Sequence, residues 1–132
     1  MQRTKEQAAV QSFVETLSGR RLYLPDIRNK NANARAGAER AAINAPMQGT
    51  ASGLIKRAMT DVSRWLVSGS LKSKLIMQAH DELVLEAPEA KLDLVKEKRP
   101  QMMMKVDEGI LKVPLITEVG VGMNWEKRIE IV

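Results

Sequence analysis

The residues best suited to chemistry stand together at His80, Asp81 and Glu82, where the single histidine of the chain lies beside two carboxylates. β-prone runs over 74–79 and 83–86 predict two strands joined by a tight turn at these residues. A hairpin that presents carboxylates could hold a hard cation such as Mg²⁺, which prefers oxygen ligands. The alternative is a polar turn with three solvated side chains.

The two neighbouring carboxylates are not equivalent candidates for one metal ion. Successive residues of an extended chain point to opposite faces, so Asp81 and Glu82 cannot both bind the same ion unless the turn bends sharply. One of the two should therefore dominate. A metal site of this kind also needs a second carboxylate from elsewhere in the protein.

A second constellation consists of Arg40, Asn44 and Gln48, which are spaced at i, i+4 and i+8. They share one face if a helix runs through Pro46. Their side chains carry hydrogen-bond donors that can reach the acceptors which every base pair shows in the minor groove. This would suit a protein that holds duplex DNA of any sequence. The alternative is an ordinary solvated helix face.

Several elements must position these residues. Helix-forming residues over Thr4–Ser12 predict a short helix, and two β-prone runs around Ser18-Gly19 predict a hairpin. Asn31 or Asn33 could cap the alanine-rich helix that follows over Ala34–Ile43.

Pro46 disturbs this helix, because proline lacks an N–H and disfavours the α conformation at Ala45. Either one helix kinks there or a second helix begins. Apolar residues beyond it fall at helical spacing and predict a stripe that faces the core. The stripe comprises Met47, Ala51, Leu54, Ile55, Ala58, Met59, Val62, Trp65 and Leu66.

The last third of the sequence is less regular. Pro88 opens a lysine-rich helical stretch, which Pro100 is expected to interrupt or kink. Val113–Gly120 predicts a final strand, with Pro114 near its beginning. The whole pattern predicts the α+β class, with a small antiparallel sheet packed against long helices and an N-terminal β-hairpin.

The chain has 132 residues and a formal net charge of +5, which favours polyanionic partners, nucleic acid first. Basic residues gather early, at Arg20, Arg21, Arg28, Lys30, Arg35 and Arg40. Aromatics make up only 3%, which argues against a single-strand binder built on base stacking. The sequence has no cysteine, as expected in a reducing compartment, and no apolar run that could span a membrane, so a cytoplasmic location is expected.

Four ordered segments resemble family A DNA polymerases of the bacterial DNA polymerase I type. The segment 19–27 is similar to the family's hairpin ending in R-x-Y-L-P-D-I. Residues 38–51 resemble its A-E-R-x-A-I-N-x-P-x-Q-G-T-A segment, and 77–84 its motif C, Q-x-H-D-E-L-V. Residues 113–125 resemble its closing strand. The similarity runs from about Thr4 to Trp125.

The resemblance implies a role for each candidate residue. Asp81 is similar to the motif C aspartate that holds two catalytic Mg²⁺ ions, and Glu82 to its more supportive neighbour. His80 and Gln48 resemble residues that contact the primer strand near its 3′ end. Arg40 and Asn44 resemble residues that hold the primer–template duplex through its minor groove. The implied partners are primer–template DNA and, in a complete enzyme, deoxynucleoside triphosphates.

Two motifs of the family do not occur in this sequence: the motif A aspartate strand and the nucleotide-gripping motif B helix. Met1–Thr4 resembles an internal stretch just after motif B. The chain is therefore expected to be a single partial domain over 1–132, part of the palm with a short fingers segment at about 1–33. We expect it to belong to a polymerase of replication or repair and to be inactive alone, with weak or absent metal binding. The alternatives are a non-catalytic duplex-binding module and a self-associating fragment.

Overall fold

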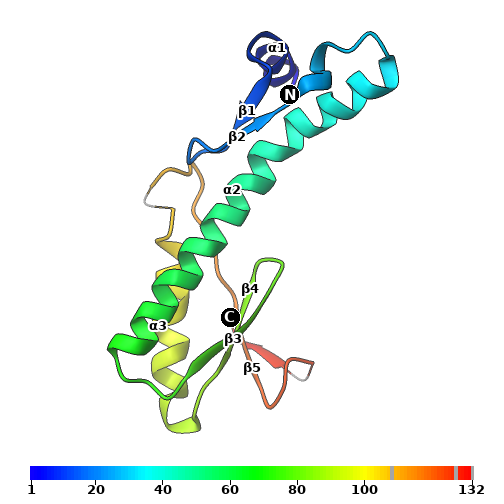
Figure 1. Ribbon diagram of the computed structural model, residues 1–132. Coiled ribbons are helices and arrows are strands. Elements are labelled where there is room, and N and C mark those ends of the chain that lie inside the picture. The colour runs from blue at the N-terminus through cyan, green and yellow to red at the C-terminus, as the bar shows by residue number, and fades with distance from the viewer. Residues whose placement is uncertain (108, 127, 132) are drawn as a thin grey trace. The chain divides into compact units, whose positions relative to one another are not determined.

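The computed structural model describes residues 1–107, 109–126 and 128–131, in two compact units, Met1–Gly53 and Leu54–Val132 (Figure 1). Helices and antiparallel strands are combined, which confirms the α+β class and the N-terminal hairpin. The described strands form three two-stranded ladders. In the described part of the chain, no helix is long and apolar enough to cross a membrane. The single partial domain with its fingers segment stays a prediction.

Unit 1 begins with a helix and a hairpin. Its elements in chain order are α1 (Gln2–Gln11), β1 (Phe13–Glu15), β2 (Arg21–Tyr23), the 3-10 helix η1 (Pro25–Arg28) and the first part of α2 (Ala32–Ser68). The hairpin register pairs Val14 with Leu22. Gly19 adopts φ +78° in the connecting loop, a left-handed conformation that glycine tolerates best.

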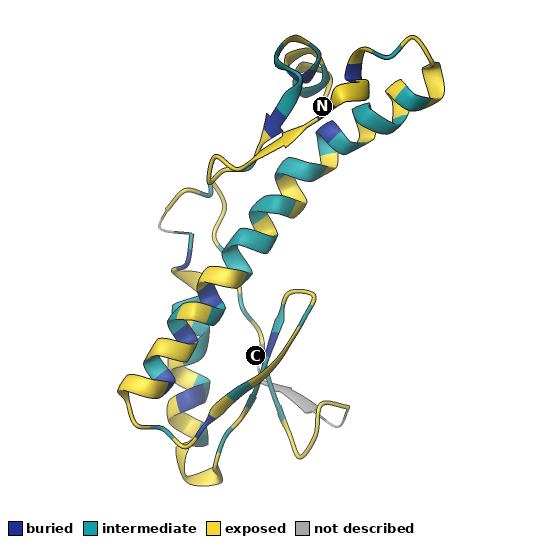
Figure 2. Cartoon of the chain, in the orientation of Figure 1, coloured by how far each residue is buried: buried dark blue, intermediate teal, exposed yellow. Residues whose placement is uncertain are grey.

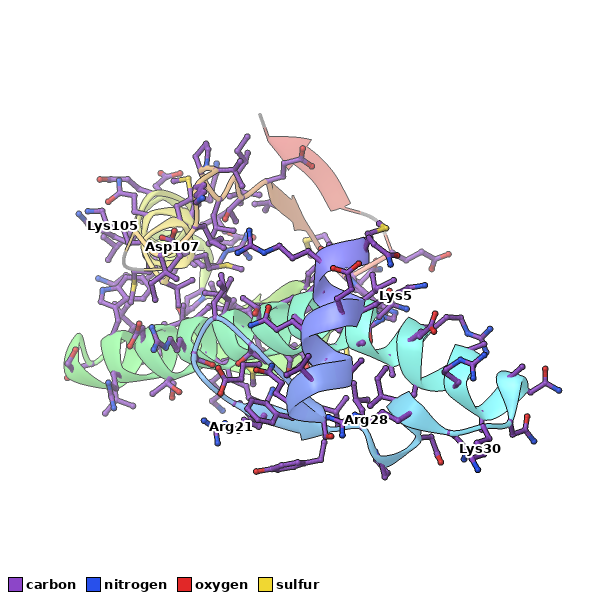
Figure 3. All side chains as sticks on the ribbon, turned by 90° about the horizontal axis from the view of Figure 1, so that it is seen from above. Lys5, Arg21, Arg28, Lys30, Lys105 and Asp107 are labelled. Atoms are coloured by element: carbon purple, nitrogen blue, oxygen red, sulfur yellow. The ribbon has the colours of Figure 1, made fainter. Side chains whose placement is uncertain are left out.

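Carbonyls at the C-terminal end of α1 accept hydrogen bonds from a backbone N–H and from an arginine side chain. Ser12 adopts φ 64°, and its N–H donates to the Ala8 carbonyl at 2.8 Å, a left-handed helix cap. The Arg28 guanidinium donates to the Ala9 and Val10 carbonyls in the last turn of α1 (Figure 3). A cation at this end also interacts favourably with the helix dipole. Arg28 therefore ties η1 to α1.

The helix α2 begins at the predicted cap and passes through its proline. The Asn31 side-chain oxygen accepts the Asn33 N–H at 2.9 Å, as an N-cap does. Pro46 lies inside the helix, so the alternative of a second helix beginning there is wrong. The Thr50 hydroxyl donates to the Pro46 carbonyl at 2.6 Å.

Unit 2 contains the rest of α2 and two further hairpin-like ladders. Its other elements are β3 (Lys74–Ala79), β4 (Glu82–Glu86), the 3-10 helix η2 (Glu89–Lys91), α3 (Leu92–Met104), β5 (Val119–Gly122) and β6 (Arg128–Ile131). Its buried cluster combines α2, β4 and the segment after α3 (Figure 2). The members are Ala58, Val62, Leu66, Leu83 and Val106.

The predicted apolar stripe is correct only in its second part. Leu54, Ile55, Ala58, Met59, Val62, Trp65 and Leu66 belong to the core of unit 2 or pack against it. Met47 is 71% exposed and Ala51 is exposed, so the prediction was wrong for both. Both lie in unit 1, whose core meets α2 through a different set of residues: Ala38, Ala41, Ala42 and Ala45.

Two predictions for the last third need correction. Pro100 does not interrupt the helix, because α3 continues to Met104, while a kink at Pro100 stays a prediction. The final strand does not begin at Val113: β5 starts at Val119, where pairing with β6 begins. Val113 is exposed and Pro114 has no N–H to contribute to a ladder, so strand-like composition alone did not produce pairing there.

Candidate functional site

The turn between β3 and β4 lies where the sequence predicted it, except that Glu82, expected in the turn, already belongs to β4. Ala79 pairs with Glu82, so His80 and Asp81 form a two-residue connection. His80 adopts φ 51°, a conformation that non-glycine residues take infrequently. A positive φ at the first central residue but not at the second, Asp81, is typical of a type II′ hairpin turn. The turn leaves the His80 and Asp81 side chains exposed at the hairpin tip.

The two carboxylates of this hairpin have different surroundings. Asp81 is exposed, and within the described residues it makes no hydrogen bond or ion pair. Glu82 is half-buried, and its Oε2 accepts a hydrogen bond from the Trp125 indole Nε1 at 3.1 Å. The Asp81 carboxylate is therefore the one that keeps its oxygens available for a cation.

One face of the hairpin is anchored in the core of unit 2. Leu83 is buried, while Leu75 and Leu85 pack against the same cluster. The strand register shifts between Leu75 and Met77, which marks a bulge at Ile76. Ile76 is 58% exposed, so the hairpin buries only part of its apolar surface.

The chemistry of Asp81 fits a magnesium ion, but the donor set is incomplete. Carboxylate oxygens are ligands that Mg²⁺ prefers. Within the described residues there is no group of three or more histidine, cysteine, aspartate or glutamate side chains that could hold a metal. The described residues therefore provide no closed set of metal ligands around Asp81.

Arg40, Asn44 and Gln48 are all exposed on α2 within unit 1. Because the helix continues through Pro46, the spacing at i, i+4 and i+8 does place them on one face. The His80 hairpin belongs to unit 2, whereas Arg40, Asn44 and Gln48 belong to unit 1. The roles of all six candidate residues stay predictions.

A groove of about 390 Å³ in unit 1 adds two arginines to the candidate residues. Arg20, Arg21 and Gln48 line it between the hairpin and α2. The Arg20 Nη2 donates to the Gly49 carbonyl at 3.3 Å, which ties the loop to the helix. The adjacent Arg20-Arg21 pair was the sequence signal for the cations at this groove, which Glu15 also lines, but no periodicity showed that they would meet Gln48.

Arg21 is already engaged inside unit 1. Its Nε donates to Glu15 Oε1 at 2.6 Å, and its guanidinium lies 4.5 Å from the centre of the Phe13 ring. The hydrogen bond with Glu15, above all, raises the pKa of Arg21 further above its usual value. Arg21 therefore stays a cation, and the Glu15 carboxylate partly balances its charge.

Arg99 on α3 is the charged residue that sequence reasoning missed. Its Nη1 donates to the Leu83 carbonyl at 3.2 Å, and its Nη2 to the Glu118 carbonyl at 3.4 Å. Burial lowers the pKa of Arg99, while the negative charge of Glu82 opposes that shift. A lysine-rich helical stretch gives no hint that one of its cations turns inward.

The fold is that of part of a polymerase. The structure resembles the polymerase domain of Pol1 from M. smegmatis, solved in complex with DNA primer-template and dNTP. The TM-score is 0.81 at 36% sequence identity, over 86% of this chain and 20% of that one.

The sequence comparisons define the family. Residues 1–127 match the model of DNA polymerase family A. DNA polymerase I of Pseudomonas aeruginosa is 54% identical over 128 residues, which are 96% of this chain and 14% of that protein. DNA polymerase I of Caldicellulosiruptor bescii is 47% identical over 113 residues, 86% of this chain and 13% of that protein. The chain belongs to DNA polymerase family A, and it spans about a seventh of the length of the relatives it matches.

Proposed function

We propose that residues 1–132 supply one side of the active site of a DNA-directed DNA polymerase, which performs template-directed nucleotidyl transfer in replication or repair. Membership of family A supports the reaction class. The observation that carries the assignment of the site is the difference between the two hairpin carboxylates: Asp81 is exposed at the tip, whereas Glu82 is engaged by Trp125.

Asp81 is proposed to be the primary ligand of the catalytic magnesium ions. Two Mg²⁺ ions, when bound, supply the positive charge that activates the primer 3′-hydroxyl and stabilises the leaving pyrophosphate. Asp81 contributes a negative charge and two oxygens at a fixed hairpin tip. Glu82 supports this arrangement from a half-buried position. The remaining ligands must come from carboxylates outside these residues.

Arg40, Asn44, Gln48 and His80 are proposed to contact primer–template DNA. The first three share an exposed face of α2, and their donors suit the acceptors common to all base pairs in the minor groove. Arg20 and Arg21 beside Gln48 add positive charge, which attracts phosphates without regard to sequence. In a complete enzyme the partners would include deoxynucleoside triphosphates.

For the polypeptide 1–132 by itself, we propose duplex binding without catalysis. The incomplete metal donor set among the described residues favours this second function. Purified chain should therefore fail to extend primers. Extension that persists after removal of trace host polymerase, and is abolished by Asp81→Ala, would show that the chain is catalytic.

The central test compares Asp81→Asn with Glu82→Gln in a complete polymerase that carries this segment. Asparagine keeps the size and one oxygen of Asp81 but loses the charge at the reacting centre. We expect the single-turnover rate to fall about 10³-fold or more. Glu82→Gln should cost roughly 10–100-fold, the range for outer partners of a metal site.

The matched measurement is duplex affinity for the same two proteins. Neither variant should bind DNA much more weakly, because removing a carboxylate relieves repulsion from phosphates. A larger rate loss in Glu82→Gln than in Asp81→Asn would overturn the assignment. So would an Asp81→Asn protein whose chemistry stays fast while DNA binding weakens.

A further inference from the structure

Arg99 bridges two ladders of unit 2 that do not pair with each other. In the described part of the chain, β4 pairs with β3 and β5 pairs with β6. Arg99 donates to the Leu83 carbonyl on β4 and to the carbonyl of Glu118, the residue before β5. One guanidinium thus contacts a backbone carbonyl of the β3–β4 ladder and the carbonyl of the residue next to the β5–β6 ladder. Arginine suits this task because its donors form a planar, rigid fork, which lysine lacks.

The same arginine lies next to the carboxylate pair. Leu83, whose carbonyl it binds, directly follows Glu82, and the negative charge of Glu82 acts on Arg99. Trp125, which follows β5 in sequence, donates its indole Nε1 to Glu82 Oε2. Glu82 is therefore attracted by a cation from α3 and bound by an indole from the segment after β5.

We propose that Arg99 is a positioning residue that, together with Trp125, fixes Glu82 and the adjoining turn so that Asp81 alone presents its carboxylate outward. This inference rests on the proposed function of Asp81 as a metal ligand. It assigns Glu82 a structural partner inside unit 2, which explains how two adjacent carboxylates acquire different roles.

The burial of Arg99 makes this arrangement sensitive to substitution. Its Nε is buried and has no hydrogen-bond partner among the described residues, so the guanidinium has the two carbonyls as hydrogen-bond partners and Glu82 as a nearby negative charge. Removing the arginine leaves both carbonyls without this donor. Removing the Glu82 charge leaves a partly buried cation without its counter-charge.

The first experiment uses the 132-residue chain and the indole N–H of Trp125 as a reporter. The chain has two tryptophans, so Trp65→Phe assigns the two indole signals in a ¹H–¹⁵N spectrum. Glu82→Gln should shift the Trp125 signal upfield, because a neutral amide accepts a weaker hydrogen bond than a carboxylate. Arg99→Met should shift it in the same direction, and Asp81→Asn, the matched control, should leave it in place.

Circular dichroism on each variant separates positioning from folding. Arg99→Lys keeps the charge but loses the fork, so we expect a folded protein with an intermediate indole shift. An unmoved Trp125 signal in folded Arg99→Met protein would overturn the proposal. Unfolding of both Arg99→Met and Arg99→Lys would also overturn it, because Arg99 would then be needed for the fold as a whole.

The second experiment measures Mg²⁺ dependence in a complete polymerase that carries this segment. Arg99→Met should raise the Mg²⁺ concentration for half-maximal rate about 10–100-fold, the range for residues that orient metal ligands. Duplex affinity should stay unchanged. An indole shift without any change in Mg²⁺ dependence would refute the positioning of Asp81. If instead Asp81→Asn itself left the rate intact, the proposed function would fail, while the contacts of Arg99 with the Leu83 carbonyl and of Trp125 with Glu82 could still stand.

Discussion

Unit 1 and unit 2 each bury a cluster of five residues, but the surroundings of the two clusters differ. The partly buried hydrophobic residues that pack against the cluster of unit 1 are small: Ala9, Ala38, Ala41 and Ala45. Large side chains pack around that of unit 2, among them Trp65, Met103 and Leu115. Unit 1 compensates with polar ties, such as those from Arg28 to α1 and from Arg20 to Gly49.

The difference separates two ways of positioning functional side chains. In unit 2 a hairpin tip carries Asp81 because the strands behind it are anchored in an apolar core through Leu83. In unit 1 arginine side chains add contacts between the elements to those of the apolar cluster. The proposed DNA-binding surface and the internal contacts of unit 1 thus share Arg20. Substitutions in the two units should therefore have different consequences.

The largest expected effect comes from the apolar core of unit 2. Leu66→Ala removes a side chain that is only 5% exposed. We expect it to lower the free energy of unfolding by about 2–5 kcal/mol, through lost burial and the cavity left behind. Val67→Ala is the matched control, because Val67 is next on α2 and 76% exposed. Chemical denaturation of both proteins measures the difference.

Hydrogen exchange would show which elements lose stability in Leu66→Ala. We expect amides of β4 and α3 to lose most protection in Leu66→Ala, since they surround the same cluster. Equal loss in α1 and the β1–β2 hairpin would contradict the view that the two units are stabilised by separate cores.

The next effect tests the close packing of unit 1. A Cβ at Gly49 would lie 2.6 Å from Thr16 Cγ2, whereas nothing lies within 4 Å of one at Gly37. Gly49→Ala should therefore destabilise the chain by about 1–3 kcal/mol. Gly37→Ala, in the same helix, should stabilise it by roughly 0.5–1 kcal/mol, because alanine is the better helix former. Thermal unfolding of both variants gives the two signs.

A second substitution identifies the clash. Thr16 cannot simply rotate, since its Oγ1 accepts the Arg20 N–H at 3.1 Å. Thr16→Ser keeps that oxygen and removes Cγ2, so it should rescue much of the Gly49→Ala loss in a double-mutant cycle. Additive losses would mean that the hairpin does not approach α2 at this glycine.

Local sequence patterns predicted the helices and strands of this chain better than the contacts between them. The hairpin around His80-Asp81, the cap at Asn31 and the apolar spacing through Leu66 follow from short-range rules, and the structure confirms them. The prediction placed Met47 in the core because it treated the apolar residues of α2 as one continuous stripe. The two parts of α2 in fact pack against their cores through different faces. Arg99 could not be foreseen, because its carbonyl partners depend on where β4 and the segment before β5 meet.

A smaller effect is expected in DNA binding. Arg40→Ala should weaken duplex binding by about 1 kcal/mol on all sequences alike, the order of one net hydrogen bond. Arg64→Ala is the matched control, being an exposed arginine on the same helix that forms an ion pair with Asp61. Titrations at several salt concentrations on unrelated duplexes measure both. A strong preference for one sequence, or equal losses in the two variants, would count against the minor-groove assignment.

The smallest effect concerns the tie between α1 and α2. Lys5 Nζ lies 2.8 Å from Glu39 Oε2, and this hydrogen bond, with the lysine charge, lowers the pKa of Glu39 below its ordinary value of 4.5 (Figure 3). A lowered carboxyl pKa stabilises the fold above the unfolded-state pKa, and that contribution is lost as the pH falls through the folded-state pKa.

Lys5→Met should return the pKa of Glu39 toward its ordinary value and flatten the acid-side dependence of stability between the two pKa values. The residual attraction of Arg35 to Glu39 should keep the shift from vanishing completely. Carboxyl titration by NMR and acid unfolding curves of both proteins measure this. An unchanged Glu39 titration in Lys5→Met would show that the ion pair does not hold α1 to α2 in solution.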